Sequence, residues 1–226
     1  MTTTRLREEA RADLWWVDLG SVNCYLVEDG DDLVLVDAGT PRSADDIARA
    51  IREAGHAVDD VARILVTHYD ADHVGALGKL GVDAPVYLGR EDAVVLAGQQ
   101  TPDWRNHKGL LQRLVQPLVV APGVPIRPVD DGDEVGGFTV YRAPGHSPGH
   151  VVYLGGDVAF LGDLVREKDG RLEPSPWHLS HDTDEVRRSI RALADRVPDF
   201  EVAAMGHGTP IVANGGDRFR ELAARL

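Results

Sequence analysis

The sequence has little cysteine, fewer basic than acidic residues, and no long apolar run. Its single cysteine, Cys24, has no partner for an internal disulfide, which favours a reducing setting. No apolar run approaches the roughly 18 residues that a membrane-spanning helix needs, so we expect no membrane association. Residues 1–13 lack the apolar core of a signal peptide. Together these absences predict a cytoplasmic protein.

The charge balance is strongly acidic. The chain carries 37 Asp and Glu against 24 Lys and Arg, giving a formal net charge of −13. A nucleic-acid-binding protein needs a basic surface to displace counterions from phosphates, and an acidic surface also disfavours anionic membranes. We therefore expect a small-molecule substrate and no nucleic-acid partner. No feature of the sequence specifies an oligomeric state.

Length and composition are those of an ordinary globular chain. With 226 residues, 43% of them hydrophobic and 27% charged, the chain can bury a large core without a disulfide or a structural zinc ion. No internal repeat or low-complexity linker interrupts it, which predicts a single domain over residues 1–226.

Hydrophobic periodicity predicts alternating clusters of strands and helices. Short apolar or alternating runs predict strands at residues 14–19, 22–28, 32–36, 61–67, 85–88, 138–142, 151–154, 158–161 and 201–205. Helical spacing predicts helices at residues 43–55, 91–97, 107–115, 183–196 and 216–226. Ser43 and Thr183 are the expected N-caps of two of these helices. The mixture predicts an α/β fold in which sheets pack face to face with helices outside.

The strongest chemical signal is THYDADHVG at residues 67–75, directly after a predicted buried strand. Within six residues it offers His68, Asp70, Asp72 and His73. Imidazoles and carboxylates are suitable ligands for zinc, iron or manganese, and a loop at a strand end can aim several side chains at one point. The alternative is a solvated acidic loop with two incidental histidines.

Three further motifs place a histidine or an aspartate at the end of a predicted strand. His146 lies in APGHSPGHV, Asp163 in LGDL, and His207 in MGHGTP. Each motif alone is weak, because single histidines and Gly-Asp turns are more often structural than metal-binding. Their common chemical character favours a metal site. His150, four residues after His146, is expected to make a structural hydrogen bond instead.

In these motifs and in their order, the sequence resembles the metallo-β-lactamase superfamily. The resemblance covers nearly the whole chain. It rests on Asp37 in VLVDAG, the loop at residues 68–73, and then His146, Asp163 and His207. It implies a four-layer αββα sandwich with the site along one edge of the sheets.

The resemblance also implies that seven side chains hold two divalent metal ions. One ion would be bound by His68, Asp70 and His146, and the other by Asp72, His73 and His207, with Asp163 bridging the two. Asp37 would orient a ligand without binding metal itself, as carboxylates next to metal ligands commonly do.

Asp70 departs from the family pattern, which usually has histidine at this position. The family favours zinc, but a harder and anionic carboxylate shifts the preference toward iron or manganese. Flavodiiron proteins of the same superfamily resemble this pattern. A second interpretation is that Asp70 binds poorly and only the second ion is held tightly.

The expected reaction is hydrolysis. Two metal ions can lower the pKa of a shared water from 15.7 toward about 7, and the resulting hydroxide would attack the carbonyl of a small ester, thioester or lactone. Asp72 would orient this nucleophile and pass a proton to the leaving group. Neither Ser147 nor Cys24 has the context of a nucleophile. The alternatives are a non-haem iron oxidoreductase, of the thiol- or persulfide-oxidising or the di-iron type, and a non-catalytic metal-binding module.

Substrate choice is expected to come from residues 98–128 and 174–181. The first region could fold over the site as a lid, with Arg105 or Lys108 meeting an anionic group. Alternatively, Trp104 packs in a small satellite core and both cations face solvent. The histidines of the second region are expected to be surface or structural residues.

Overall fold

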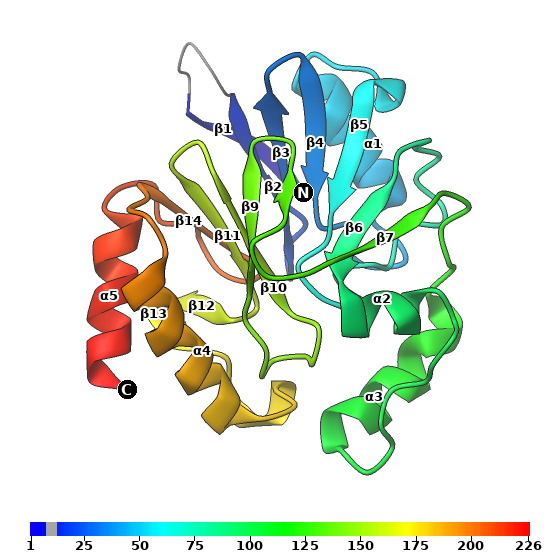
Figure 1. Cartoon of the computed structure of the whole chain (residues 1–226). Helices are drawn as coiled ribbons and strands as arrows, with labels where there is room; N and C mark the ends of the chain where they lie inside the picture. Colours follow the sequence, from blue (N-terminus) through cyan, green and yellow to red (C-terminus); the bar gives the residue numbers. More distant parts are fainter. Residues whose placement is uncertain (8–12) are drawn as a thin grey trace.

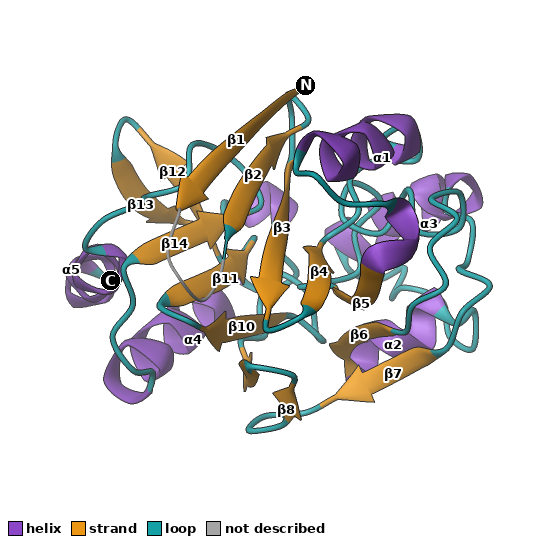
Figure 2. Ribbon diagram, turned by 90° about the horizontal axis from the view of Figure 1, so that it is seen from above, coloured by secondary structure: helices purple, strands orange, loops and turns teal. Residues whose placement is uncertain are grey.

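Two β-sheets lie face to face at the centre of the protein, and helices cover their outer faces (Figures 1 and 2). This computed structural model describes residues 1–7 and 13–226. Helices α1, α2 and α3 lie on the side of one sheet, and α4 and α5 lie on the side of the other (Figure 2). The predicted four-layer αββα sandwich is therefore confirmed.

The larger sheet has seven strands whose spatial order is their chain order. They are β1 (Thr2–Arg7), β2 (Leu14–Asp18), β3 (Asn23–Asp29), β4 (Asp32–Val36), β5 (Val61–Leu65), β6 (Val86–Gly89) and β7 (Ile126–Val129). Neighbours from β1 to β4 are antiparallel, whereas those from β4 to β7 are parallel. Parallel neighbours need long connections, and these contain α1 (Ala44–Glu53), the turn η1 (Val58–Asp60), α2 (Arg90–Leu96), α3 (His107–Val115) and the turn η2 (Gln116–Leu118).

The smaller sheet has five strands and comes mostly from the second half of the chain. In spatial order they are β14 (Val202–Met205), β11 (Val158–Gly162), β10 (Val151–Gly155), β9 (Phe138–Arg142) and β8 (Glu134–Val135). Its outer face packs against α4 (Thr183–Arg196) and α5 (Gly215–Arg225). A separate hairpin of β12 (Val165–Lys168) and β13 (Arg171–Pro174) is followed by the turn η3 (Trp177–Leu179).

The core has three apolar layers because strand residues alternate between the two faces of a sheet. On β5, Ile64 packs in the layer beneath α1, and its neighbour Leu65 packs between the sheets. Phe160 of β11 faces the same layer between the sheets, whereas Leu161 packs beneath α4 and α5. Of the helices in the described part of the chain, none is long and apolar enough to cross a membrane.

Every strand and helix predicted from the sequence is present, with bounds shifted by a few residues. One of the two predicted caps is wrong. Ser43 does occupy the N-cap position of α1, although its hydroxyl bonds to Thr40 and makes no side-chain bond to the backbone of the helix. Thr183 is the first helical residue, and Asp182 caps α4 by accepting hydrogen bonds from the next turn. Strands β1, β7, β8, β12 and β13 were not predicted, because they are short or carry charged and proline residues in place of apolar alternation.

A matched pair of leucines tests the layer between the sheets. Leu65 is fully buried in it, whereas Leu118 is 60% exposed. We expect Leu65→Ala to lower the free energy of unfolding by about 2–5 kcal/mol, because it leaves a cavity. Leu118→Ala should change it by less than about 0.5 kcal/mol. Urea denaturation followed by circular dichroism measures both, and equal losses would contradict this assignment of the core.

Candidate metal centre

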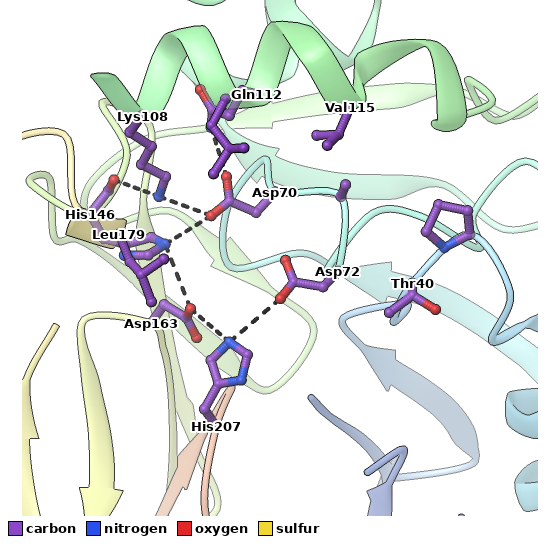
Figure 3. A pocket seen from close by; sticks show the side chains of 13 residues that line it. Thr40, Asp70, Asp72, Lys108, Gln112, Val115, His146, Asp163, Leu179 and His207 are labelled. Atoms are coloured by element: carbon purple, nitrogen blue, oxygen red, sulfur yellow. Dashed lines mark hydrogen bonds and ion pairs between the residues drawn. The ribbon is translucent and has the colours of Figure 1, made fainter. Parts of the chain in front are cut away.

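Loops that follow four strand ends bring histidines and aspartates together at one edge of the two sheets (Figure 3). The loop after β5 contributes four of the seven predicted ligands. The loops after β9, β11 and β14 contribute one each. The complete set is His68, Asp70, Asp72 and His73 from the first loop, then His146, Asp163 and His207. The structure therefore brings all seven predicted residues into one site.

Six of the seven side chains form two groups of three, in each of which the ligand atoms lie within 4.8 Å of one another. The first metal group is His68, His146 and Asp163, and the second metal group is Asp72, His73 and His207. Asp163 also faces the second group, with Oδ2 at 3.0 Å from Nε2 of His207 and Oδ1 at 3.5 Å from Nε2 of His73. This placement suits a bridging carboxylate.

Three inward-facing atoms have no hydrogen-bond partner among the described residues. They are Nε2 of His68, Nε2 of His73 and Oδ1 of Asp163, and all three are buried. Buried polar atoms almost always have a partner, so unpartnered atoms that face one another indicate a missing ligand. Imidazole nitrogens and carboxylate oxygens form the donor set that zinc, iron and manganese accept. The residues present therefore fit a pair of divalent metal ions.

The opposite nitrogen of each of the four histidines is held by the protein. A contact at Nδ1 fixes the ring and leaves Nε2 free to face the centre, as in most metal-binding histidines. The Nδ1 contacts are Thr67 Oγ1 for His68 (3.0 Å), Asp37 Oδ2 for His73 (2.9 Å), Ser175 Oγ for His146 (2.8 Å) and the Ser21 carbonyl for His207 (2.6 Å).

Asp37 orients the loop and stays outside the centre. It accepts hydrogen bonds from the backbone N–H of Thr67 at 2.8 Å and from the Thr67 hydroxyl, and it contacts Nδ1 of His73. Its φ of 58° lies in the left-handed region, which aspartate tolerates better than most residues. The orienting role that the resemblance implied for Asp37 agrees with these contacts.

Charges within the site set the protonation of the second metal group. Burial alone would lower the pKa of His73, but the carboxylates of Asp163 and Asp37 raise it to about 10. For His207, Asp163 likewise outweighs burial and raises the pKa to about 9. The pKa of Asp163 lies well below its usual value, because the neighbouring histidines outweigh its burial. Protons and metal ions therefore compete for the same nitrogens.

Asp70 differs from the other predicted ligands because helix α3 holds it. Its Oδ2 lies 3.0 Å from Nε2 of His146 and 3.3 Å from Nε2 of His68, but it also forms an ion pair with Nζ of Lys108 at 2.9 Å. Its Oδ1 accepts from Gln112 at 2.7 Å. Burial and the Lys108 cation lower the pKa of His146 to about 3, so its imidazole is neutral and ready to bind metal.

Two residues near the centre differ from what the sequence indicated. The predicted structural hydrogen bond of His150 is wrong, because both of its buried ring nitrogens lack a partner among the described residues; the ring instead stacks on His68, with 5.2 Å between centroids. Asp92 of α2 was not predicted. It is buried and accepts from Tyr69 N and from Ser147 Oγ, and so ties together two site loops. An acidic residue in the first turn of a helix gives no sign of such burial.

A cavity of about 320 Å³ opens beside the centre, and α3 forms one of its walls (Figure 3). Its apolar lining includes Pro41, Leu111, Val115 and Leu179. Helix α3, which lies within residues 98–128, therefore borders the site, and the role of this region in substrate choice stays a prediction. Other residues of this segment lie on the surface: Trp104 is 62% exposed, with the exposed Arg105 over its ring, so the predicted satellite core is wrong.

Sequence comparison agrees with this geometry. The profile of the Metallo-beta-lactamase superfamily matches residues 17–207, and the chain belongs to this superfamily. The probable metallo-hydrolase YflN of Bacillus subtilis is 30% identical, over 85% of this chain and 82% of its own. YobT of the same organism is 29% identical, over 83% of both chains. The superfamily is one of metal-binding hydrolases.

Solved structures extend the comparison. TTHA1623, solved in a di-iron-bound form, is 30% identical with a TM-score of 0.66, covering 90% of this chain and 92% of its own. BJP-1, a subclass B3 metallo-β-lactamase of Bradyrhizobium japonicum, has a TM-score of 0.68 over 97% of this chain and 89% of its own. At 21% identity, BJP-1 shows the shared fold alone.

Asp37→Asn tests the orienting contact. The amide keeps the shape of the side chain but removes the negative charge beside His73, so we expect metal affinity to fall about 10- to 100-fold. Competition with a chromophoric chelator measures this affinity. Asp59→Asn, on the exposed turn η1, is the matched control and should bind metal like the unmodified protein. Equal affinities for all three proteins would contradict the assigned role.

The raised pKa values of His73 and His207 predict proton release on metal binding. At neutral pH the metal-stripped protein carries protons on both rings, so loading should release roughly two protons. Apparent affinity should rise with pH and level off once both histidines are neutral, above about pH 9–10. Calorimetric titration in buffers of different ionisation enthalpy counts the protons. A heat of binding that is independent of the buffer would contradict this prediction.

Proposed function

We propose that the protein is a metal-dependent hydrolase acting on a small thioester, lactone or ester. The observation that carries this proposal is the convergence, beside an apolar cavity, of buried nitrogen and oxygen atoms that have no hydrogen-bond partner in the described part of the chain. Membership in a superfamily of metallo-hydrolases supports the reaction class. The acidic surface and the small cavity support a small-molecule substrate.

The proposed metal ligands are the two metal groups described above, with Asp163 shared between them. Bound divalent ions would supply water of lowered pKa and would polarise a substrate carbonyl. We propose two ions, with zinc favoured by the family. A single cysteine that is buried and unpaired supports a cytoplasmic setting.

Asp72 is the proposed catalytic residue. Its side chain is 40% exposed, more than any other candidate ligand, and it lines the cavity. Its Oδ2 lies 3.6 Å from Nε2 of His207, which places one oxygen toward the centre. A carboxylate in this position can orient an attacking water, accept its proton and pass that proton to the leaving group.

The cavity lining supports an uncharged substrate with an apolar part. The described side chains facing the cavity include one lysine and no arginine, and this lysine, Lys108, is already paired with Asp70. Lys108 therefore neither faces solvent nor is free to meet an anionic group of a substrate, the two roles that the sequence suggested for it. An acyl or alkyl portion could instead pack against Leu111, Val115 and Leu179.

The second candidate is a non-haem iron oxidoreductase, which the di-iron form of TTHA1623 favours. Elemental analysis of protein purified without added metal separates the two functions. Bound iron together with oxygen consumption in the presence of a thiol or persulfide would support the oxidoreductase. Bound zinc or manganese together with hydrolysis would support the hydrolase.

Asp72→Ala tests the proposed mechanism. We expect turnover of the substrate, selected from a panel of thioesters, lactones and aryl esters, to fall by at least roughly 10²- to 10⁴-fold, because proton transfer and one proposed metal ligand are lost together. The circular dichroism spectrum should not change. Asp59→Ala, in which an exposed carboxylate is lost, is the matched control. Turnover that survives in Asp72→Ala would exclude the mechanism.

A further inference from the structure

Lys108 is a buried cation in direct contact with the metal centre, and the proposed reaction gives it no role. It lies in the first turn of α3 and is 4% exposed. Its Nζ donates to the His146 carbonyl at 2.7 Å and lies 2.9 Å from Oδ2 of Asp70. A buried ammonium group is costly unless it is paired and hydrogen-bonded, and these contacts satisfy that requirement.

The fold holds α3 so that two of its side chains reach Asp70. The Asn106 side chain caps the helix and also donates to the His181 carbonyl at 2.9 Å, which anchors the start of α3 beside the centre. Gln112 lies one turn after Lys108 and therefore on the same face. It donates to Oδ1 of Asp70 and to the carbonyl of Tyr69. Both oxygens of Asp70 are thus engaged by one helix.

We propose that Lys108 is the counter-charge of Asp70 and sets the metal affinity of the first metal group. Where the superfamily usually has a neutral histidine, this chain has a carboxylate, and the ion pair of Asp70 with Lys108 has the same zero net charge. Lys108 is a positioning residue in this proposal, which rests on the proposed metal-dependent function.

Lys108 and a metal ion in the first metal group would compete for the same oxygen of Asp70, so Lys108 should weaken metal binding there. Oδ2 of Asp70 is the oxygen that faces His68 and His146, and it is also the one paired with Lys108. A metal ion in the first group would be repelled by the nearby ammonium and would share this oxygen with it. The second group has no lysine or arginine contact among the described residues. The first group should therefore bind metal more weakly than the second.

Lys108→Met tests this charge effect, and Gln112→Leu is its matched control. Each substitution removes one contact between α3 and Asp70, but only the first removes a charge. Stripped proteins are titrated with Zn²⁺ against a chromophoric chelator, and bound zinc is counted by elemental analysis. We expect two unequal binding steps in the unmodified protein, the weaker of which tightens at least tenfold in Lys108→Met. Lys168→Met on the surface should change it less than threefold, and Gln112→Leu, which removes a contact but no charge, should not tighten it.

A second pair of variants tests the same contact if Lys108→Met folds poorly. Asp70→His leaves Lys108 buried without its carboxylate, so the weaker step should loosen at least tenfold. The double variant, Asp70→His with Lys108→Met, has no unpaired buried charge at this contact, so it should restore the affinity of the weaker binding step. Failure of this rescue, an unchanged weaker step in folded Lys108→Met, or an equal effect of Gln112→Leu would overturn the proposal. If the unmodified protein bound no zinc, the proposed function would fail as well. If it bound zinc and hydrolysed its substrate, but the variants kept the same affinity in the weaker binding step, only the role of Lys108 would be overturned.

Discussion

The carboxylate of Asp163 joins the two halves of the centre, and much of the surrounding structure serves to bury it. It follows β11 of the smaller sheet, yet it faces His73 on the loop of the larger sheet and His207 after β14. A buried carboxylate is stable only with partners of opposite charge or with a metal ion. The backbone also makes room for it: a Cβ at Gly206 would lie 2.1 Å from its Oδ1. Glycine is therefore required where the chain passes this group.

The two sheets must stay in register for this carboxylate to meet ligands from both. Side chains of β3 in the larger sheet hydrogen-bond to the end of β14 in the smaller one. Tyr25 Oη donates to the Met205 carbonyl at 2.7 Å, and Asn23 Nδ2 donates to the carbonyls of Met205 and Gly208. These bonds fix the strand end from which His207 departs. The position of one ligand thus depends on a contact between chain segments far apart in sequence.

Local patterns were enough to predict the helices and the strands with clear apolar alternation, because periodicity depends on neighbours in the chain; the ordered set of ligands came from the resemblance to the superfamily. The contact of Lys108 with Asp70 depends instead on how a helix in an irregular region folds back over the site. No periodicity encodes that contact, and a lysine is rarely a buried residue. The hydrogen bond expected for His150 is absent for a similar reason: its Pro- and Gly-rich turn places the ring against His68, and neither ring nitrogen has a hydrogen-bond partner within residues 1–7 and 13–226.

The contact between Lys108 and Asp70 also affects which metal ion the site prefers. A free carboxylate at position 70 would add a hard, anionic ligand and favour iron or manganese. Here one oxygen of Asp70 accepts a hydrogen bond from Gln112 of α3, and the other forms an ion pair with Lys108, which cancels its charge. The remaining donors are four imidazoles and the carboxylates of Asp72 and Asp163, a mixed nitrogen and oxygen set that suits zinc as well as iron. Asp70, in place of the usual histidine, therefore disfavours zinc less than the sequence alone suggests.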